Sequence, residues 1–198
     1  MALPILRKRK KWRRWQVALI VIGVLLAATA AFLFWPVHED LSHLAAPPGR
    51  YDVRILRDTW GVPHIFGQTD ADVAFGLAYA HAEDDFLTIQ QTYLAARGKL
   101  ATVYGRDAAP NDYMVHLLRI WDVVDDKYDT IPAKTRAVME AYADGLNHYA
   151  ALHEDEALPG LFPISGKDVA AGFIHKVPLF FGIDAVLGQL FTEQRPSP

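Results

Sequence analysis

The sequence predicts an α+β protein that is mostly helical, with an N-terminal β-hairpin and one transmembrane helix ahead of it. Residues 17–35 form an uncharged apolar run that is long enough to cross a bilayer as a helix. Residues 51–66 alternate apolar and polar side chains around a Trp-Gly turn, which is typical of a hairpin. From residue 69 onward, apolar side chains recur at helical spacing.

Composition excludes several classes of site. The chain has 198 residues, of which 52% are hydrophobic and 22% charged, and this suits one globular domain of ordinary size. It contains no cysteine, so cysteine nucleophiles, zinc–thiolate sites and iron–sulfur clusters are excluded for this chain. Seven of the 20 basic residues lie in residues 1–16, which leaves 13 basic against 23 acidic residues in the remainder.

The basic cluster and the apolar run together predict a membrane topology. The positive-inside rule places residues 1–16 in the cytoplasm as a basic tail and residues 17–35 in the bilayer. Trp12, Trp15 and Trp35 lie near the ends of the run, where aromatic rings favour the interface. We therefore expect an inner-membrane anchor with the body in the periplasm or outside the cell. Nucleic acid is not an expected partner, because the body is acidic and the basic cluster adjoins the apolar run.

The apolar run has two interpretations, a retained signal anchor and a cleaved signal peptide. Ala28-Thr29-Ala30 offers a small-residue cleavage site, and cleavage there would give a secreted protein. The run is long for a signal peptide, however, and it continues as far as Trp35, which favours the anchor. Both interpretations place the body outside the cytoplasm.

A linker and a hairpin follow the membrane segment. Residues 36–49 form the linker, in which Pro47-Pro48-Gly49 breaks regular structure. Residues 51–55 alternate apolar and polar side chains, as a half-buried strand does. Trp60-Gly61 lets the chain reverse, and Pro63 suits the start of an edge strand.

Capping signals predict where three helices begin. Thr69 with Asp72 resembles a capping box and predicts a helix that continues to about Arg97, with Gly98 immediately after it. Pro132 predicts the first turn of the next helix, which begins near Thr130, because its missing N–H costs nothing there.

The third cap signal is Ser165 with Asp168, which predicts a helix that is broken near Pro178. Residues 179–191 are apolar on all sides of the following helical segment. Such a helix requires burial on several sides, so this segment predicts a partner.

Residues 57–65, Arg-Asp-Thr-Trp-Gly-Val-Pro-His-Ile, resemble the opening signature of the penicillin acylase (penicillin amidase) family of two-chain N-terminal-nucleophile hydrolases. Further strings similar to family motifs follow in the same order at residues 75–85, 96–105 and 141–147, and then a Leu-Pro loop precedes the Asp168 helix. The motif residues to which we assign structural roles are Arg57, Asp58, Gly61, Pro63, His64, Gly76, Asp84, Gly98, Gly105, Tyr142, Gly145 and Asn147.

The resemblance implies that residues 50–198 are the α-chain region of an αββα sandwich, incomplete without the β chain of the same precursor. In the family, the N-terminal Ser of the β chain attacks an acyl amide, such as a penicillin or an acyl-homoserine lactone, and releases a carboxylic acid and an amine. The wording of residues 96–101 is similar to the branch that cleaves long-chain acyl amides, including acyl-homoserine lactones. This chain alone is therefore expected to be inactive.

The residues of this chain do not themselves predict a catalytic centre. Ser42, Ser165 and Ser197 lack an accompanying base, so none is expected to be a nucleophile. The histidines form no paired metal motif, and exposed polar faces account for them. Penicillin G-type members bind calcium through a Glu before an Ile-Asp pair, and here Gly182 stands in that place. We therefore expect no metal and no cofactor.

Leu179, Phe180 and Phe181 are the candidate substrate-binding residues. Family α chains contribute side chains near this point to the acyl-chain pocket, and apolar residues suit an acyl tail. Plain packing of these residues against the β chain is the alternative interpretation.

The charged motif residues have open alternatives as well. Arg57 and Asp58 either pair with charged groups of the β chain or form a solvated strand end. Asp84 is a candidate for a buried polar residue, and His64 is expected to act in packing rather than directly in catalysis. A rival hypothesis for the whole chain is a non-catalytic, membrane-anchored interaction module or a truncated remnant that binds another chain through its apolar carboxyl end.

Overall fold

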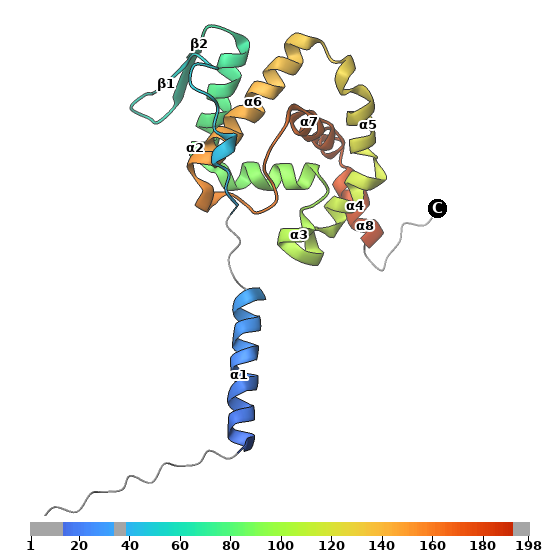
Figure 1. Cartoon of the computed structure of the whole chain (residues 1–198). Coiled ribbons are helices and arrows are strands. Elements are labelled where there is room, and N and C mark those ends of the chain that lie inside the picture. Colours follow the sequence, from blue (N-terminus) through green and yellow to red (C-terminus); the bar gives the residue numbers. More distant parts are fainter. Residues whose placement is uncertain (1–13, 34–38, 192–198) are drawn as a thin grey trace, which may run out of the picture. The chain divides into compact units, whose positions relative to one another are not determined.

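The structure is a computed structural model that describes residues 14–33 and 39–191 (Figure 1). The chain divides into two compact units, residues 1–37 and residues 38–198. The second unit is mostly helical with a small two-stranded sheet, as the sequence predicts.

The first unit contains one helix, α1 (Arg14–Leu33), whose apolar side chains are exposed on all sides. The stretch Trp15–Leu33 is long and apolar enough to cross a membrane. The membrane span itself stays a prediction. Most of the predicted basic tail and the last two residues of the predicted span lie outside the described residues.

The second unit contains one hairpin followed by a series of helices (Figure 1). Its main elements are β1 (Val53–Arg57), β2 (Pro63–Gly67), α2 (Asp70–Ala96), α3 (Ala101–Tyr104), α4 (Ala109–Leu117), α5 (Ile120–Lys127), α6 (Ala133–Leu152), α7 (Gly166–Phe180) and α8 (Ile183–Phe191). Helices α3 to α5 have no counterpart in the sequence prediction. Each of these helices is too short for apolar side chains to recur several times at helical spacing, so the sequence pattern does not reveal it.

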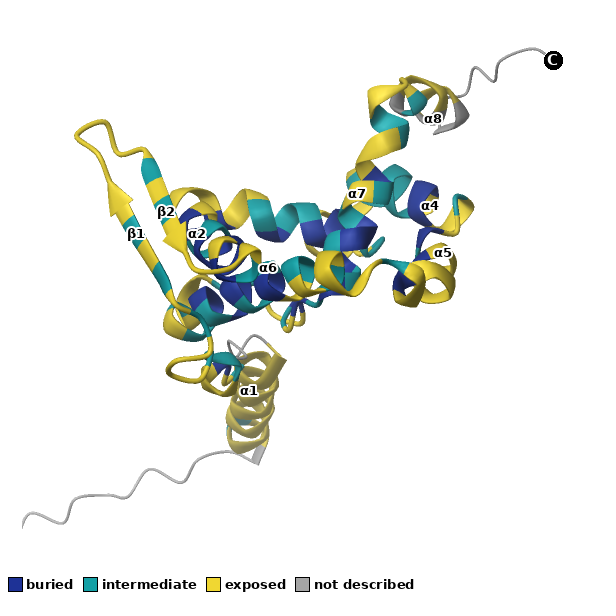
Figure 2. Ribbon diagram, turned by 90° about the horizontal axis from the view of Figure 1, so that it is seen from above, coloured by how far each residue is buried: buried dark blue, intermediate teal, exposed yellow. Residues whose placement is uncertain are grey.

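The hairpin lies against α2. Strands β1 and β2 are antiparallel, with Val53 opposite Gly67 and Arg57 opposite Pro63. Gly76 of α2 makes the close approach possible, because a Cβ atom there would come within 2.4 Å of Val53 Cγ2. The opposite face of the hairpin and its turn are largely exposed (Figure 2).

Helix α2 begins at the predicted capping box. The Thr69 hydroxyl oxygen accepts a hydrogen bond from the Asp72 N–H at 3.2 Å, and Asp72 Oδ2 accepts one from the Thr69 N–H at 2.9 Å. The helix is interrupted at Asp85, which has φ −159° and ψ 72°. The Asp85 carboxylate accepts a hydrogen bond from the Thr88 N–H at 3.1 Å and so caps the second half of the helix.

Helix α6 begins at Ala133, slightly later than the predicted start near Thr130. Pro132 is the residue before the helix rather than part of its first turn, and it has an extended ψ of 135°. Thr130 belongs to a short 3-10 helix, where its hydroxyl donates to the Lys127 carbonyl at 2.6 Å. This local hydrogen bond competes with continuation into α6.

Helix α7 begins at the predicted capping box of Ser165 and Asp168, and the break predicted near Pro178 occurs just after it, between Phe180 and Ile183. Pro178 lies inside the helix, which continues to Phe180. Pro178 lacks a backbone N–H, but it lies only two residues before the helix ends. The missing hydrogen bond therefore affects only the last turn of α7. The separation from α8 occurs at Gly182, whose φ is 77°.

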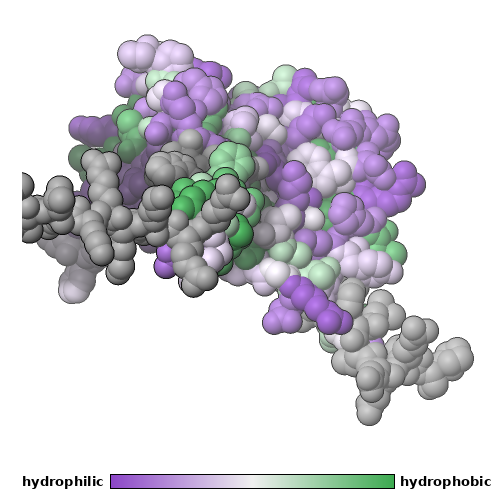
Figure 3. All heavy atoms as spheres, turned by 60° about the horizontal axis from the view of Figure 1, so that its bottom comes forward, coloured by the Kyte–Doolittle hydropathy of each residue, from purple (hydrophilic) through white to green (hydrophobic). Residues whose placement is uncertain are grey.

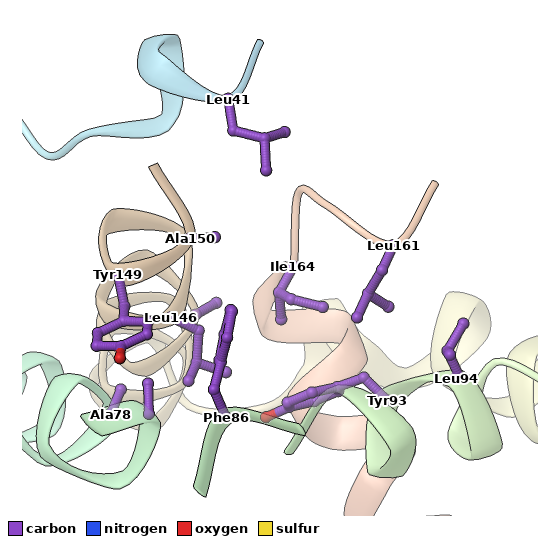
Figure 4. Packing of buried hydrophobic residues seen from close by; sticks show 12 residues of the cluster. Leu41, Ala78, Phe86, Tyr93, Leu94, Leu146, Tyr149, Ala150, Leu161 and Ile164 are labelled. Atoms are coloured by element: carbon purple, nitrogen blue, oxygen red, sulfur yellow. The ribbon is translucent and has the colours of Figure 1, made fainter. Parts of the chain in front are cut away.

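The main core lies between α2 and α6, with Phe86, Leu146 and Tyr149 at its centre (Figure 4). Part of the predicted linker belongs to this core. Leu41 is only 5% exposed, and its N–H donates to Glu154 Oε1 at 3.0 Å. Leu41, Leu44 and Ala46 of this segment therefore pack against the core, whereas residues 47–49 are exposed.

A second core cluster joins α5 to α7. It includes the fully buried Ile120 and Val124 of α5 and Ala171 of α7. Outside these clusters, the surface drawn in Figure 3 is mainly hydrophilic, with smaller hydrophobic patches between the polar residues.

Candidate functional site

Two buried amide side chains hold the loop that leads into α7. Asn147 of α6 donates to the Ile164 carbonyl and accepts from the Ile164 N–H, each at 2.7 Å. Gln90 of α2 donates to the Glu156 carbonyl at 3.0 Å and accepts from the Leu158 N–H at 2.6 Å. An amide offers a donor and an acceptor together, so each side chain satisfies loop backbone groups that would otherwise be unpaired.

Arg97 binds the same region from the end of α2. Its Nε lies 2.5 Å from Asp168 Oδ1, and its Nη2 donates to the Pro163 carbonyl at 2.8 Å. Its Nη1 donates to the Leu161 carbonyl. The Asp168 side chain is only 4% exposed, so this ion pair lies almost entirely away from water. The start of α7 is therefore fixed by both α2 and α6.

The other end of α7 carries the three predicted substrate-binding residues. Leu179 is half-buried, whereas Phe180 is 85% exposed and Phe181 is 86% exposed. Two adjacent aromatic rings are thus presented to solvent at the end of a helix whose start is rigidly held. Burying either ring would remove a large apolar area from water.

The hairpin motif is organised within this chain. Arg57 donates to the Gly61 carbonyl at 2.8 Å across the turn. The same guanidinium pairs with Glu83 at 2.9 Å and with Asp84 at 2.8 Å, both on α2. The prediction that Asp84 is buried is wrong for this structure, since its side chain is 51% exposed. Its carboxylate is on the helix surface because it meets the arginine of the hairpin there.

Asp58 shapes the turn itself. Its Oδ1 accepts hydrogen bonds from the Trp60 N–H at 2.8 Å and the Val62 N–H at 3.0 Å. These two backbone donors stabilise the carboxylate and lower the pKa of Asp58. The half-exposed His64 lies beside it, with Nε2 3.4 Å from Asp58 Oδ2. Asp58 therefore has partners in its own turn, whether or not a β chain also approaches it.

Two cavities open on the second unit. The first, of about 640 Å³, is lined by charged side chains that include Arg97, Lys99, Arg119 and Asp122. Its charges are partly compensated, because Arg119 Nε lies 2.5 Å from Asp122 and Arg97 is paired with Asp168.

The second cavity, which we call the three-helix groove, has a volume of about 650 Å³ and lies between α2, α6 and α7. Its lining is almost entirely apolar and includes Leu77 and Ile89 of α2, Met139 of α6 and Phe173 of α7. The groove is large enough for several side chains of a partner or for a long acyl chain.

His175 of α7 is the most deeply buried histidine of the described chain, with an exposed fraction of 2%. Its Nε2 lies 2.8 Å from Asn111 Oδ1, while its Nδ1 is buried without a hydrogen-bond partner among the described residues. Burial, and then the positive charge of Lys176, lower the pKa of His175. The neutral imidazole is therefore the form that the fold favours.

We expect His175 to make the fold sensitive to mild acid. Its folded pKa is lower than the unfolded value of 6.5, so its effect on stability is constant above pH 6.5. Below pH 6.5 the unfolded chain binds the extra proton, and the free energy of unfolding falls until the pH passes the folded pKa. One such group contributes a slope of at most about 1.4 kcal/mol per pH unit.

Urea unfolding of wild-type protein and His175→Gln between pH 7.5 and pH 5 measures this slope. The Gln amide keeps a donor for Asn111, and it does not titrate. The wild type is expected to lose more stability than the variant as the pH falls below 6.5. Equal losses in the two proteins would contradict the assignment.

Comparison with known proteins decides the family. The sequence profile of penicillin amidase matches residues 52–180, which contain the hairpin and all helices from α2 to α7. The chain belongs to the penicillin amidase family.

Its relatives are acylases of two kinds. Penicillin acylase 2 proenzyme from Pseudomonas sp. (strain SE83) is 32% identical over 108 residues, which are 54% of this chain and 14% of that protein. Acyl-homoserine lactone acylase PvdQ from Pseudomonas fluorescens (strain Pf0-1) is 27% identical over 152 residues, which are 72% of this chain and 19% of that protein. The chain thus spans less than one fifth of the length of these relatives.

A solved structure shows the same fold. The thermostable penicillin G acylase from Alcaligenes faecalis matches with a TM-score of 0.58 at 22% identity, over 70% of this chain and 80% of the matched chain. The likeness supports a penicillin acylase fold for this part of the chain, mostly helical with a small two-stranded sheet.

The family-motif residues fall at joints between elements. Gly76 lies under the hairpin, and Gly145 lies where α6 crosses α2. Tyr142 lines the three-helix groove, and its hydroxyl lies 3.0 Å from His81 Nδ1. The remaining positions are Arg57, Asp58, Gly61, Pro63 and His64 on the hairpin, Asp84 on α2, Gly98 after α2, Gly105 after α3 and Asn147 on α6. Arg97 and Gln90 are functional positions of the loop that no local sequence pattern marks.

No catalytic triad is formed within the described residues of this chain. Ser42 donates to Asp40 at 2.6 Å, and Ser165 is the N-cap of α7. Ser197 lies outside the described residues. Within residues 14–33 and 39–191, no group of three His, Asp or Glu side chains is placed to hold a metal ion.

Proposed function

We propose that this chain is the α part of an amidohydrolase that cleaves an acyl amide into a carboxylic acid and an amine. The observation that carries the proposal is the penicillin amidase match over residues 52–180. The named relatives act on penicillin or on acyl-homoserine lactones, which are both acyl amides. Residues 17–35 would anchor the enzyme in the membrane, with the catalytic body in the periplasm.

The nucleophile in this proposal is the N-terminal Ser of a β chain. Its own α-amine is the base, since an α-amine has a pKa near neutrality and is held beside the hydroxyl. The α part contributes position and substrate contact. Arg97, Asn147 and Gln90 hold the start of α7, and the helix presents its last residues to the partner that carries the serine.

Leu179, Phe180 and Phe181 would bind the acyl chain at that junction. Phe180 and Phe181 are exposed and therefore free to contact a ligand or a partner chain, and Leu179 is half-buried. An apolar wall selects acyl chains by length, because each buried methylene contributes about 0.8 kcal/mol. The long-chain branch, which includes the acyl-homoserine lactone acylases, is therefore the substrate class that we propose.

Activity of the purified chain, alone and co-expressed with the β chain of penicillin acylase 2, tests this function. The substrates are penicillin G and acyl-homoserine lactones with short and long acyl chains. We expect hydrolysis only when both chains are present, and faster hydrolysis of long acyl chains. Activity of this chain alone would show that it contains an unrecognised nucleophile. Binding without activity would support the interaction-module hypothesis.

The pocket assignment has its own test. In the active pair, Phe180→Asp should raise the KM for a long-chain lactone by about ten-fold and change the KM for a short-chain lactone less. Leu152→Asp at the end of α6 is the matched control, because Leu152 is also exposed and does not line the three-helix groove. Equal effects on both substrates would assign Phe180 to packing against the β chain.

A further inference from the structure

Helix α7 is tied to the last turn of α2 at two points. Asp168, near the start of α7, pairs directly with Arg97. His175 comes seven residues later and lies on the same face of the helix, since seven residues complete about two turns. Ala171, between the two, is fully buried, so this face points into the protein. Asp168 and His175 are therefore two anchors on one buried stripe.

The second anchor passes through Asn111 of α4, which lies beside α7 (Figure 2). Asn111 Nδ2 donates to the Ala95 carbonyl in the last turn of α2 at 3.0 Å. A carbonyl can only accept, so the amide nitrogen faces α2 and Oδ1 faces His175. His175 Nε2 therefore carries the proton and donates to Asn111 Oδ1 at 2.8 Å. One side chain with a fixed orientation thus connects His175 to α2.

The last turn of α7 follows directly from this anchor. An α-helix places the N–H of residue 179 against the carbonyl of residue 175, so Leu179 lies one turn beyond His175 on the same face. Pro178 has no N–H and removes one hydrogen bond to the preceding turn. Phe180 and Phe181 are exposed, so core packing does not hold them. His175 is the last buried residue of α7, and the turn depends on it for its position.

We propose that His175 and Asn111 are positioning residues for the acyl-binding turn, residues 179–181, and so determine how tightly a long acyl chain binds. This inference rests on the proposed function, which assigns Leu179, Phe180 and Phe181 to the acyl chain. His175 is 2% exposed, so it acts through the helix and not by touching the substrate. A displaced apolar wall loses contacts with methylene groups, and a long chain has more of these contacts to lose.

A purely structural role for the pair predicts a different pattern. General destabilisation would open all of α7, including its first turn. The first turn has its own anchors in Arg97 and Asn147, which do not depend on His175. The two roles therefore differ in which backbone amides of α7 lose protection from exchange.

Hydrogen exchange of the full chain measures the order of the turn without a β chain. His175→Leu and Asn111→Leu should each speed exchange of the amides between Lys176 and Phe181 by about ten-fold and leave residues 167–171 unchanged. His175→Gln keeps a donor for Asn111, so its exchange should fall between those variants and the wild type. Lys176→Gln changes an exposed neighbour on the same turn, and as the matched control it should have no effect.

The double substitution tests whether the two residues act as a unit. His175→Leu with Asn111→Leu should speed exchange little more than either substitution alone, because both break the same hydrogen bond. Circular dichroism checks that every variant is folded. If His175→Leu does not fold, His175→Gln and Asn111→Leu carry the comparison.

Kinetics of the active pair with the β chain of penicillin acylase 2 test the link to the substrate. His175→Leu should raise the KM for a long-chain lactone by about five-fold, with a smaller change for a short-chain lactone and a nearly unchanged kcat. His175→Gln should restore most of the affinity for the long chain.

The outcomes separate this inference from the proposed function. Faster exchange along all of α7, or an effect of Lys176→Gln as large as that of His175→Leu, overturns the positioning role. Faster exchange confined to the last turn, with an unchanged KM for the long-chain lactone in an active pair, overturns the link to acyl binding and leaves the proposed function intact. A wild-type pair without activity overturns the proposed function and the acyl-binding role together.

Discussion

Replacing Arg97 with Met should lower the free energy of unfolding by about 3–5 kcal/mol, which is among the largest effects expected from a single substitution in this chain. The substitution removes an ion pair with Asp168, whose side chain is 4% exposed, and hydrogen bonds to two loop carbonyls. A buried carboxylate left without its cation cannot recover its hydration, and this accounts for the cost. Urea denaturation followed by circular dichroism measures it.

Two further variants make the Arg97 prediction specific. Arg97→Lys keeps a positive charge, but it cannot reach Asp168 and both carbonyls together, so an intermediate loss is expected. Arg119→Met removes an ion pair of the same type whose side chains are 75% and 60% exposed. It should change the free energy of unfolding by less than about 1 kcal/mol. A similar loss in Arg97→Met and Arg119→Met would contradict the assigned role of burial.

The second large effect is expected at the crossing of α2 and α6. Gly145 lies in α6 against α2, and a Cβ atom there would come within 2.4 Å of the Phe75 carbonyl oxygen and 2.8 Å of Ala78 Cβ. Gly145→Ala should therefore separate the two helices and cost about 3 kcal/mol, despite the better helix propensity of alanine. The opposing group is backbone, which cannot move aside as a flexible side chain can.

Gly172→Ala in α7 is the matched control for Gly145→Ala. It is the same substitution in another helix, and no atom lies within 4 Å of the Cβ that it adds. Removing a helix-interior glycine should raise stability by up to about 1 kcal/mol. The two substitutions should therefore shift the midpoint of thermal unfolding in opposite directions. A neutral or stabilising Gly145→Ala would show that the helices tolerate a wider spacing.

Short-range patterns were sufficient for much of the fold. The two capping boxes, at Thr69–Asp72 and Ser165–Asp168, form as predicted because each involves residues only three positions apart. The hairpin forms as predicted because alternation and a turn specify it locally. The exact helix ends near Pro132 and Pro178 differ from the prediction by a few residues, because the neighbouring turns decide where each helix begins or ends.

The candidate site was only partly predictable. The aromatic pair at the end of α7 was found because its residue types stand out in the sequence, and its role in binding remains a prediction. Arg97 and Gln90 received no role, since each lies in a helical pattern and looks like an ordinary polar position. Their partners are 71 and 66 residues away, at Asp168 and Glu156. No local pattern reports a contact of that range.

The sequence by itself determined the helical class, the hairpin, the apolar N-terminal helix and the family of this protein. All of these depend on residue types within a few positions of one another or on ordered motifs. Only the tertiary structure decided that Gly145 and Gly76 are points of close approach, and that three helices leave an apolar groove beside α7. The physical reason is that packing depends on which faces of distant elements meet. In a closely packed core, the combined shapes of many side chains determine which faces fit together.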